Sequence, residues 1–205
     1  LEKSARILEL GCGAGRIGIN LARLGYENVL STDFSENMVK VANAIIERDG
    51  LNMSAQVCDA TDIALPDASF DAVIFGFNGL MQIPKAENRL RAMEEIFRVL
   101  RRGGKFVFTT HDRKTPRNRN YWLKEEKQWL HGVQDPRLDD FGDIYYKGDH
   151  GNIFIHSPSK EEVLESLREA GFEPTLCRLR SEIAAEPPAV LDFSDDCIFW
   201  TAERK

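Results

Sequence analysis

The sequence predicts a single α/β domain, residues 1–205, built on a mostly parallel sheet with helices on both faces. Over residues 6–110, short β-rich apolar runs alternate with stretches of helical periodicity, which is the pattern of βαβ units. A glycine-rich turn, GCGAG at 11–15, follows the first apolar run directly. The length of 205 residues, with 42% hydrophobic and 29% charged residues, suits one folded domain.

The first half of the chain is expected to contain five strands joined by helices. The strands are predicted at 6–10, 28–33, 54–59, 70–77 and 105–110. Helices are predicted at 16–24, after an N-cap at Ser35, and at 87–100, where Gly103 and Gly104 follow as a stop signal. Because βαβ crossovers are right-handed, these strands should form a parallel sheet covered on both sides.

The alternation stops at residues 112–158, which are rich in charged and aromatic residues. A linker would not carry so many side chains that need burial, so we expect an inserted cap or substrate subdomain after the fifth strand. Within it, 143–156 predicts a hairpin turning at 148–151. Strand five ends at the sheet edge where ligands bind, so we expect the insertion to cover the acceptor pocket, with Tyr145 or Tyr146 pointing inward.

Regular structure is expected to resume at Ser159, which begins a capping box at 159–162. The helix that follows should run to Ala170 and stop at Gly171. Two last strands are predicted at 173–180 and 197–203.

Composition narrows the classes of function. The net charge of −6 argues against nucleic acid as a partner, because phosphate binding needs a basic footprint. The longest apolar run, 72–77, is far shorter than the roughly 20 residues of a membrane helix, and no signal peptide opens the chain. Four scattered cysteines indicate free thiols in a reducing compartment, and we therefore expect a cytoplasmic protein. No histidine pair has metal-ligand spacing, so no metal is expected.

The glycine turn allows two interpretations. Gly13, Gly15 and Gly18 match the GxGxxG dinucleotide fingerprint, but Gly18 would then lie inside the helix. The other pattern is E-x-G-x-G-x-G, with Glu9 at the end of the strand and Gly11 beginning the turn. A carboxylate there repels a pyrophosphate and attracts a cation, so the electrostatics favour S-adenosylmethionine, which has an ammonium and no phosphate.

This segment resembles the first motif of the class I S-adenosylmethionine-dependent methyltransferases, of methyltransferase type 11/25. Other family motifs follow in the family's order, at 70–74, 99–106 and 170–172. The resemblance covers most of 5–110 and returns from Ser159 to the end. It implies a Rossmann-like seven-stranded, mostly parallel sheet with the last strand antiparallel.

The resemblance also implies a cofactor site for S-adenosyl-L-methionine. Asp33 is similar to the acid that holds the ribose hydroxyls, and Asp59 and Ala60 are similar to the residues that read the adenine edge. The residues assigned to the cofactor are Glu9, Gly11, Cys12, Gly13, Gly15, Arg16, Asp33, Phe34, Met38, Asp59, Ala60 and Phe75. Glu9 is expected to hold the ammonium, Phe34 and Met38 to flank the adenine, and Phe75 to lie near the sulfonium.

Two features depart from the family pattern. Only residues 1–4 precede the first strand, where the family usually has a helix or two, so we expect part of the lid to be missing from this sequence. The fourth strand ends in FGFN rather than Asn/Asp-Pro-Pro-Tyr/Phe, which argues against amino methylation of DNA.

The predicted function is methyl transfer from S-adenosylmethionine to the oxygen or nitrogen of a small-molecule acceptor by in-line displacement. His111 and Asp112, just past the fifth strand, are the candidate catalytic base, and Tyr145 and Tyr146 are the candidate substrate contacts. Two alternatives remain open: an NAD(P)-dependent oxidoreductase, and a catalytically silent S-adenosylmethionine-binding module. The sequence does not determine the oligomeric state.

Overall fold

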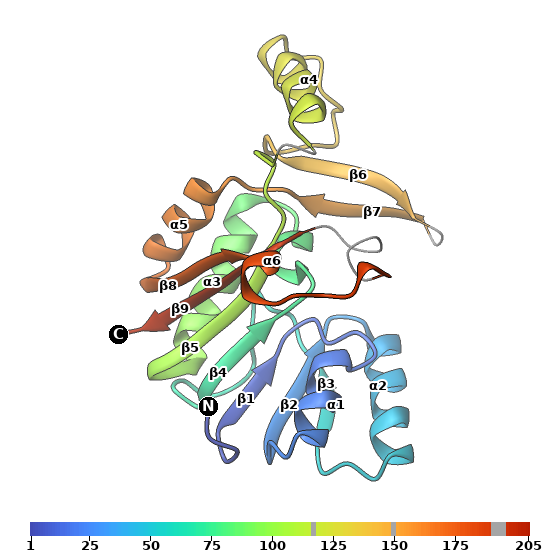
Figure 1. Ribbon diagram of the computed structural model, residues 1–205, viewed down its shortest axis with the longest axis vertical. Helices are drawn as coiled ribbons and strands as arrows, with labels where there is room; N and C mark the ends of the chain where they lie inside the picture. The colour runs from blue at the N-terminus through green and yellow to red at the C-terminus, as the bar shows by residue number, and fades with distance from the viewer. Residues whose placement is uncertain (116–117, 149–150, 190–195) are drawn as a thin grey trace.

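A computed structural model describes residues 1–115, 118–148, 151–189 and 196–205. Seven strands form one sheet in the order β3-β2-β1-β4-β5-β9-β8 (Figure 1). The strands are β1 Arg6–Glu9, β2 Asn28–Asp33, β3 Ser54–Val57, β4 Phe70–Phe75, β5 Leu100–Thr110, β8 Phe172–Leu179 and β9 Ile198–Arg204. The pairs among β1 to β5 are parallel, and β9 runs antiparallel to both of its neighbours, β5 and β8. The predicted sheet, with its last strand antiparallel, is confirmed.

Helices cover both faces of this sheet. They are α1 Arg16–Arg23, α2 Glu36–Arg48, α3 Ala86–Val99, α5 Lys160–Glu169, the short α6 Arg180–Ile183 and the 3-10 turn η1 Gly79–Gln82. Successive side chains of a strand point to opposite faces. Leu8 of β1 therefore packs in the large core with Ile96 of α3, whereas the adjacent Ile7 packs with Leu21 of α1.

The fifth strand starts earlier than expected. It begins at Leu100, so Gly103 and Gly104 lie within it and do not separate helix from strand. Leu100 pairs with Phe70, whereas Lys105 pairs with Ala72, so the register between β4 and β5 shifts between these two pairs. The two glycines lie in this irregular part of β5.

The segment 112–158 contains the helix α4 Arg119–Leu130 and the hairpin β6 Asp143–Gly148 with β7 Gly151–His156. The predicted hairpin is confirmed by antiparallel pairs such as Tyr145 with Phe154, while turn residues Asp149 and His150 lie outside the described residues. The segment extends beyond the end of the sheet at which the parallel strands terminate (Figure 1). Its aromatic residues pack together: Phe141 lies edge-on to both Trp122 and Trp129 of α4.

Within the described ranges, no helix combines the length and the apolar character needed to cross a membrane. All four cysteines are free thiols, as expected.

Candidate functional site

A cavity of about 660 Å³ opens at the carboxyl ends of β1, β2, β3 and β4. Its size falls within the range of small-molecule sites, and its position is the ligand-binding edge of open α/β sheets. It is lined by Leu10, Gly11, Gly13, Asp33, Phe34, Met38, Cys58, Asp59, Ala60, Thr61, Phe75, Gly76, Phe77, Gly79, Gln82, Ile83, Pro84 and Asn88.

The glycine turn forms one wall of the cavity. Gly11, Gly13 and Gly15 have φ angles of 63°, 53° and 87°, which a side chain would strain. A Cβ on Gly11 would also lie 2.8 Å from the ring of Phe75. The turn thus brings bare backbone to the cavity, and Gly15 then serves as the N-cap of α1.

Glu9 does not line the cavity, and its predicted contact with the cofactor's ammonium stays a prediction. Its side chain is buried beneath α1, where Oε2 accepts hydrogen bonds from the Gly18 N–H at 2.9 Å and the Ser31 hydroxyl at 2.6 Å. The Gly18 N–H is one of the first helical donors, which have no partner within the helix. Burial raises the pKa of Glu9, while these hydrogen bonds favour its charged form.

The position of Gly18 inside the helix does not suit the dinucleotide fingerprint, and the structure gives this glycine a different role. A Cβ there would lie 2.0 Å from the Ser31 Oγ and 2.5 Å from the Glu9 Oε2. Gly18 is therefore required for Glu9 to reach the amino end of α1. The GxGxxG spacing was the sequence signal for this close approach.

Asp33 lies on the cavity wall and also holds the glycine turn in place. Its Oδ2 accepts a hydrogen bond from the Gly13 N–H at 2.8 Å, and its Oδ1 accepts one from the Ser35 N–H at 2.8 Å. A carboxylate has about four acceptor sites, so each oxygen retains capacity for a further donor. Two free acceptor positions on adjacent oxygens are what a ribose diol requires, and the ribose assignment stays a prediction.

The far end of the cavity combines exposed apolar surface with a carboxylate. Phe34 is 74% exposed and Met38 is 46% exposed, although both line the cavity. Asp59 and Ala60, which follow β3 in the chain, also line the cavity. Asp59 Oδ1 accepts hydrogen bonds from the Thr61 N–H and hydroxyl. Apolar residues left exposed in this way indicate a surface for a flat aromatic ligand.

Phe75 ends β4 and forms the floor beside the glycine turn. It is buried, and a Cβ on Gly79 would lie 2.4 Å from its ring, so the ring fits between two glycines. The residues that continue this wall, Gln82 to Pro84 and Asn88, were not predicted from the sequence. Their place just after a central parallel strand was the signal that could have identified them.

Besides Glu9, three predicted cofactor residues lie outside the cavity lining, namely Cys12, Gly15 and Arg16. The Cys12 side chain is buried behind the turn, and burial, with the nearby charges of Glu9 and Asp33, raises the pKa of its thiol to about 12. Arg16 is exposed, with its guanidinium 4.5 Å from the centre of the Phe77 ring. For both side chains, the predicted contact with the cofactor is not supported by this geometry.

The candidate base, His111, does not line the cavity. His111 Nε2 lies 3.0 Å from Asn78 Nδ2, and the Asn78 N–H donates to the Thr109 hydroxyl at 2.9 Å. Phe77 and Asn78 have φ angles of 51° and 60°, a left-handed conformation that asparagine adopts readily but that is strained for Phe77. His111 thus supports a strained turn in the cavity wall, whereas Asp112 accepts a hydrogen bond from the Lys114 N–H.

Tyr145 and Tyr146 do not line this cavity, and the expectation that one of them points into an acceptor pocket stays a prediction. The Tyr145 ring packs edge-on against Phe154 across the hairpin and beneath the Arg137 guanidinium, and Tyr146 is 46% exposed. No described residue of 112–158 appears in the lining. The segment does lie beyond the end of the sheet at which the parallel strands terminate.

The charge of the lining is the feature that best separates ligand classes. Asp33 and Asp59 contribute carboxylates, and none of the described lining residues is a lysine or an arginine. Among the described residues, no group of histidine, cysteine or carboxylate side chains could hold a metal ion. The wall therefore suits hydroxyl, amino and sulfonium groups better than phosphates.

Comparison with known proteins agrees with this site. Residues 7–104 match the model of a methyltransferase domain. The demethylmenaquinone methyltransferase of Listeria monocytogenes is 35% identical over 110 residues, which cover 52% of this chain and 45% of that protein. The chain thus spans about 45% of the length of this relative.

Solved structures share the fold over the whole chain. An S-adenosylmethionine-dependent methyltransferase from Methanosarcina mazei superposes with a TM-score of 0.79 at 21% identity, covering 100% of this chain and 94% of that one. The [4+2]-cyclase SpnF superposes with a TM-score of 0.70 at 22% identity, covering 100% and 76%. The fold is that of the Rossmann-like methyltransferases. Residues 7–104 thus match the methyltransferase-domain family, and the whole chain shares the fold of an S-adenosylmethionine-dependent methyltransferase.

Proposed function

We propose that this protein transfers a methyl group from S-adenosylmethionine to a small-molecule acceptor. The observation that supports it best is the cavity lining, which has two carboxylates and no cationic side chain among the described residues. A dinucleotide would place a pyrophosphate against this wall, which makes the oxidoreductase alternative electrostatically unfavourable.

In this proposal, the described residues position the cofactor. Asp33 accepts hydrogen bonds from the ribose hydroxyls. Phe34 and Met38 contact the adenine, and the backbone of Gly11 and Gly13 leaves room for the amino-acid portion of the cofactor. The cofactor, when bound, supplies an activated methyl group on a sulfonium. Because displacement at this carbon needs mainly alignment at about 3 Å and exclusion of water, the protein's task is placement.

An oxygen or nitrogen acceptor forms its bond to the methyl carbon as the carbon–sulfur bond breaks, and it loses a proton. We propose that His111 accepts this proton at Nε2 once the turn at Phe77 and Asn78 moves the Asn78 amide, now 3.0 Å from that nitrogen, away from it. A His111→Gln variant should lower kcat at least about a hundredfold and remove the acidic limb of the pH profile, because a general base loses its function when it is protonated, with little change in the affinity for S-adenosylhomocysteine. An unchanged pH profile would exclude this role.

The acceptor is best sought among aromatic and quinone-like compounds. The Listeria relative is named for its action on demethylmenaquinone, and the apolar wall of Phe77, Ile83 and Pro84 suits such a ring. The test is calorimetric titration with S-adenosylmethionine and with NADH, followed by an acceptor panel that includes quinols, phenols and amines. Tighter binding of NADH would refute the proposal. Binding of S-adenosylmethionine without methyl transfer would favour another use of this fold, as the cyclase SpnF illustrates.

A further inference from the structure

The cavity wall formed by Ile83, Pro84 and Asn88 depends on an unusual helix start. Lys85 is the N-cap of α3, has a φ of 68°, and provides no side-chain hydrogen bond to the helix. A non-glycine residue with this φ is strained, and an N-cap without an acceptor leaves the first N–H groups of the helix unsatisfied. The junction between the wall and α3 therefore needs support from elsewhere.

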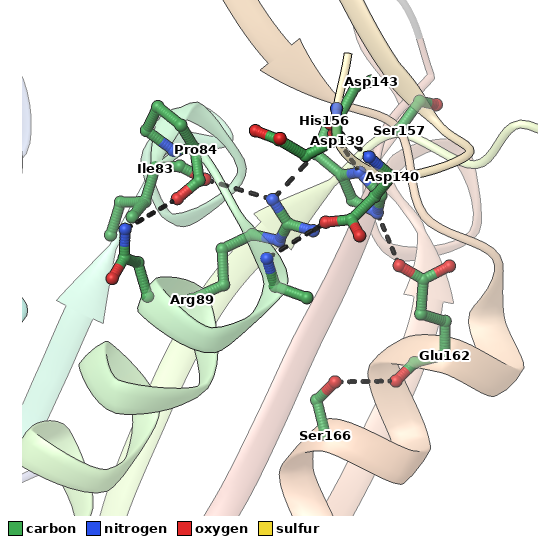
Figure 2. Close-up of polar contacts among 12 residues, drawn as sticks. Ile83, Pro84, Arg89, Asp139, Asp140, Asp143, His156, Ser157, Glu162 and Ser166 are labelled. Carbon is green, nitrogen blue, oxygen red and sulfur yellow. Dashed lines mark hydrogen bonds and ion pairs between the residues drawn. The ribbon is translucent and has the colours of Figure 1, made fainter.

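That support comes from the 112–158 segment. Asp140 Oδ2 accepts a hydrogen bond from the N–H of Ala86, the first residue of α3, at 3.0 Å. The same oxygen pairs with Arg89 at 3.0 Å, and Arg89 donates in turn to the Ile83 carbonyl at 3.1 Å. Figure 2 shows Arg89 lying between Ile83 and Pro84 on one side and the acidic residues of the segment on the other. A carboxylate at the amino end of a helix also interacts favourably with the helix dipole.

Asp140 is itself held by a buried chain of charges. Its N–H donates to Asp143 at 2.8 Å, and the other oxygen of Asp143 accepts from His156 Nδ1 at 2.8 Å. His156 Nε2 contacts Glu162 of α5, which also pairs with Arg113 at 2.7 Å. The Asp143 and His156 side chains are 1% exposed and that of Arg89 is 7% exposed, so each buried charge depends on its partners.

From this geometry we propose that Arg89 and Asp140 are positioning residues of the cofactor cavity, through which docking of the 112–158 segment sets the wall at Ile83 to Asn88. This inference deepens the proposed function, and it rests on it only for the identity of the ligand. Coupling between two sites is reciprocal, so occupation of the cavity should also stabilise the docked segment. The segment then controls ligand binding although none of its described residues lines the cavity.

The test compares Asp140→Ala with Lys114→Ala. Lys114 pairs with Glu161 at 2.8 Å, so this control also breaks an ion pair between the segment and α5, but the control pair is exposed and remote from Arg89. Asp140→Ala should lower the affinity for S-adenosylhomocysteine at least about fivefold and speed amide exchange at 83–89, whereas Lys114→Ala should change neither. Asp140→Asn, which keeps an acceptor oxygen for the Ala86 N–H, should have a smaller effect.

Because the coupling is reciprocal, ligand binding should also change amide exchange in the docked segment, and a merely structural role of Asp140 would not produce this change. S-adenosylhomocysteine should slow amide exchange at 139–148 in the native protein and in Lys114→Ala, and should lose this effect in Asp140→Ala. Native affinity together with native exchange at 83–89 in Asp140→Ala would overturn the inference. If the native protein does not bind S-adenosylhomocysteine, the proposed function fails, and exchange at 83–89 alone still decides whether the segment sets the wall.

Discussion

Two carboxylates near the glycine turn, each at the end of a strand, have different surroundings in the structure. Glu9 is 1% exposed and satisfies N–H donors of α1, while Asp33 faces the cavity and retains acceptor capacity. Both were predicted to bind the cofactor directly. In the structure Asp33 lines the cavity, whereas Glu9 accepts hydrogen bonds from Gly18 and Ser31 beneath α1.

Replacing Asp33 with alanine should weaken S-adenosylhomocysteine binding by roughly 1.5–3 kcal/mol, the range for hydrogen bonds to a charged group. The Gly13 and Ser35 N–H groups would also lose their acceptor, so the turn should loosen. Calorimetry measures the affinity, and Glu36→Gln is the control, because Glu36 is nearby, exposed and paired with the equally exposed Lys40. Unchanged affinity in folded Asp33→Ala would refute the ribose assignment.

Replacing Glu9 with glutamine should lower stability as well as affinity. The two side chains have nearly the same shape, but the amide keeps only one acceptor oxygen, for the donors of Gly18 and Ser31, and lacks the charge that the hydrogen bonds from Ser31, Gly18 and Ile17 favour. A loss of about 1–3 kcal/mol in the free energy of unfolding is expected, read from denaturant titration. Weaker cofactor binding with native stability would instead restore the direct contact that the sequence predicted.

At the scale of single elements, β9 lies between β5 and the edge strand β8. Trp200, 0% exposed, stacks on Phe108 and donates from its indole N–H to the Thr110 hydroxyl at 2.9 Å. Residues 198–203 of this strand pair with 105–110 of β5, so β9 links the end of the chain to the strand from which the 112–158 segment departs.

We expect Trp200→Phe to lower the free energy of unfolding by about 2–4 kcal/mol, because it removes a hydrogen bond and leaves a cavity. Thr110→Val should restore part of this loss in the double variant, since both partners of the hydrogen bond are then apolar. A double-mutant cycle by urea unfolding measures the coupling. Strictly additive effects would show that the hydrogen bond contributes little.

At the scale of the whole molecule, the charges around His156 join the hairpin, α3 and α5. Burial by itself would lower the pKa of His156, but hydrogen bonds to Asp143 and Glu162 outweigh burial and raise the pKa. Burial likewise opposes ionisation of Glu162, yet its hydrogen bonds from His156 and Arg113 lower its pKa to about 2. The imidazolium is thus shared by two carboxylates, and Arg89 lies 4.0 Å from Asp143.

These shifts predict a window of maximal stability. The contribution of His156 is complete below its unfolded pKa of about 6.5 and is lost as the pH rises through its higher folded value. The contribution of Glu162 is present above about 4.3 and is lost as the pH falls toward 2. The network should therefore stabilise the protein most between about pH 4.5 and 6.5.

The measurement is the difference in melting temperature between the native protein and His156→Gln. This difference should be largest at pH 4.5–6.5 and should narrow on both sides, while Lys114→Ala should keep the native profile. A difference that stays constant from pH 6 to 9 would show that His156 is not charged in the folded protein.

Local chemistry made much of this protein predictable from sequence. The alternation of strands and helices, the glycine turn, the N-caps Ser35 and Ser159 and the hairpin at 143–156 depend on neighbouring residues, and the structure contains all of them. The register of β4 with β5 was not predictable, because the pairing of Phe70 with Leu100 involves two distant segments.

The direction in which each functional side chain points was decided by the tertiary structure. Glu9 turns inward because Gly18 and Ser31, 9 and 22 residues away, offer it donors in the buried space beneath α1. Asp140 caps α3 across a separation of 54 residues, a contact that no local pattern encodes. Sequence patterns determine which elements form, whereas the burial of charges and the satisfaction of helix ends depend on which residues the folded chain brings together.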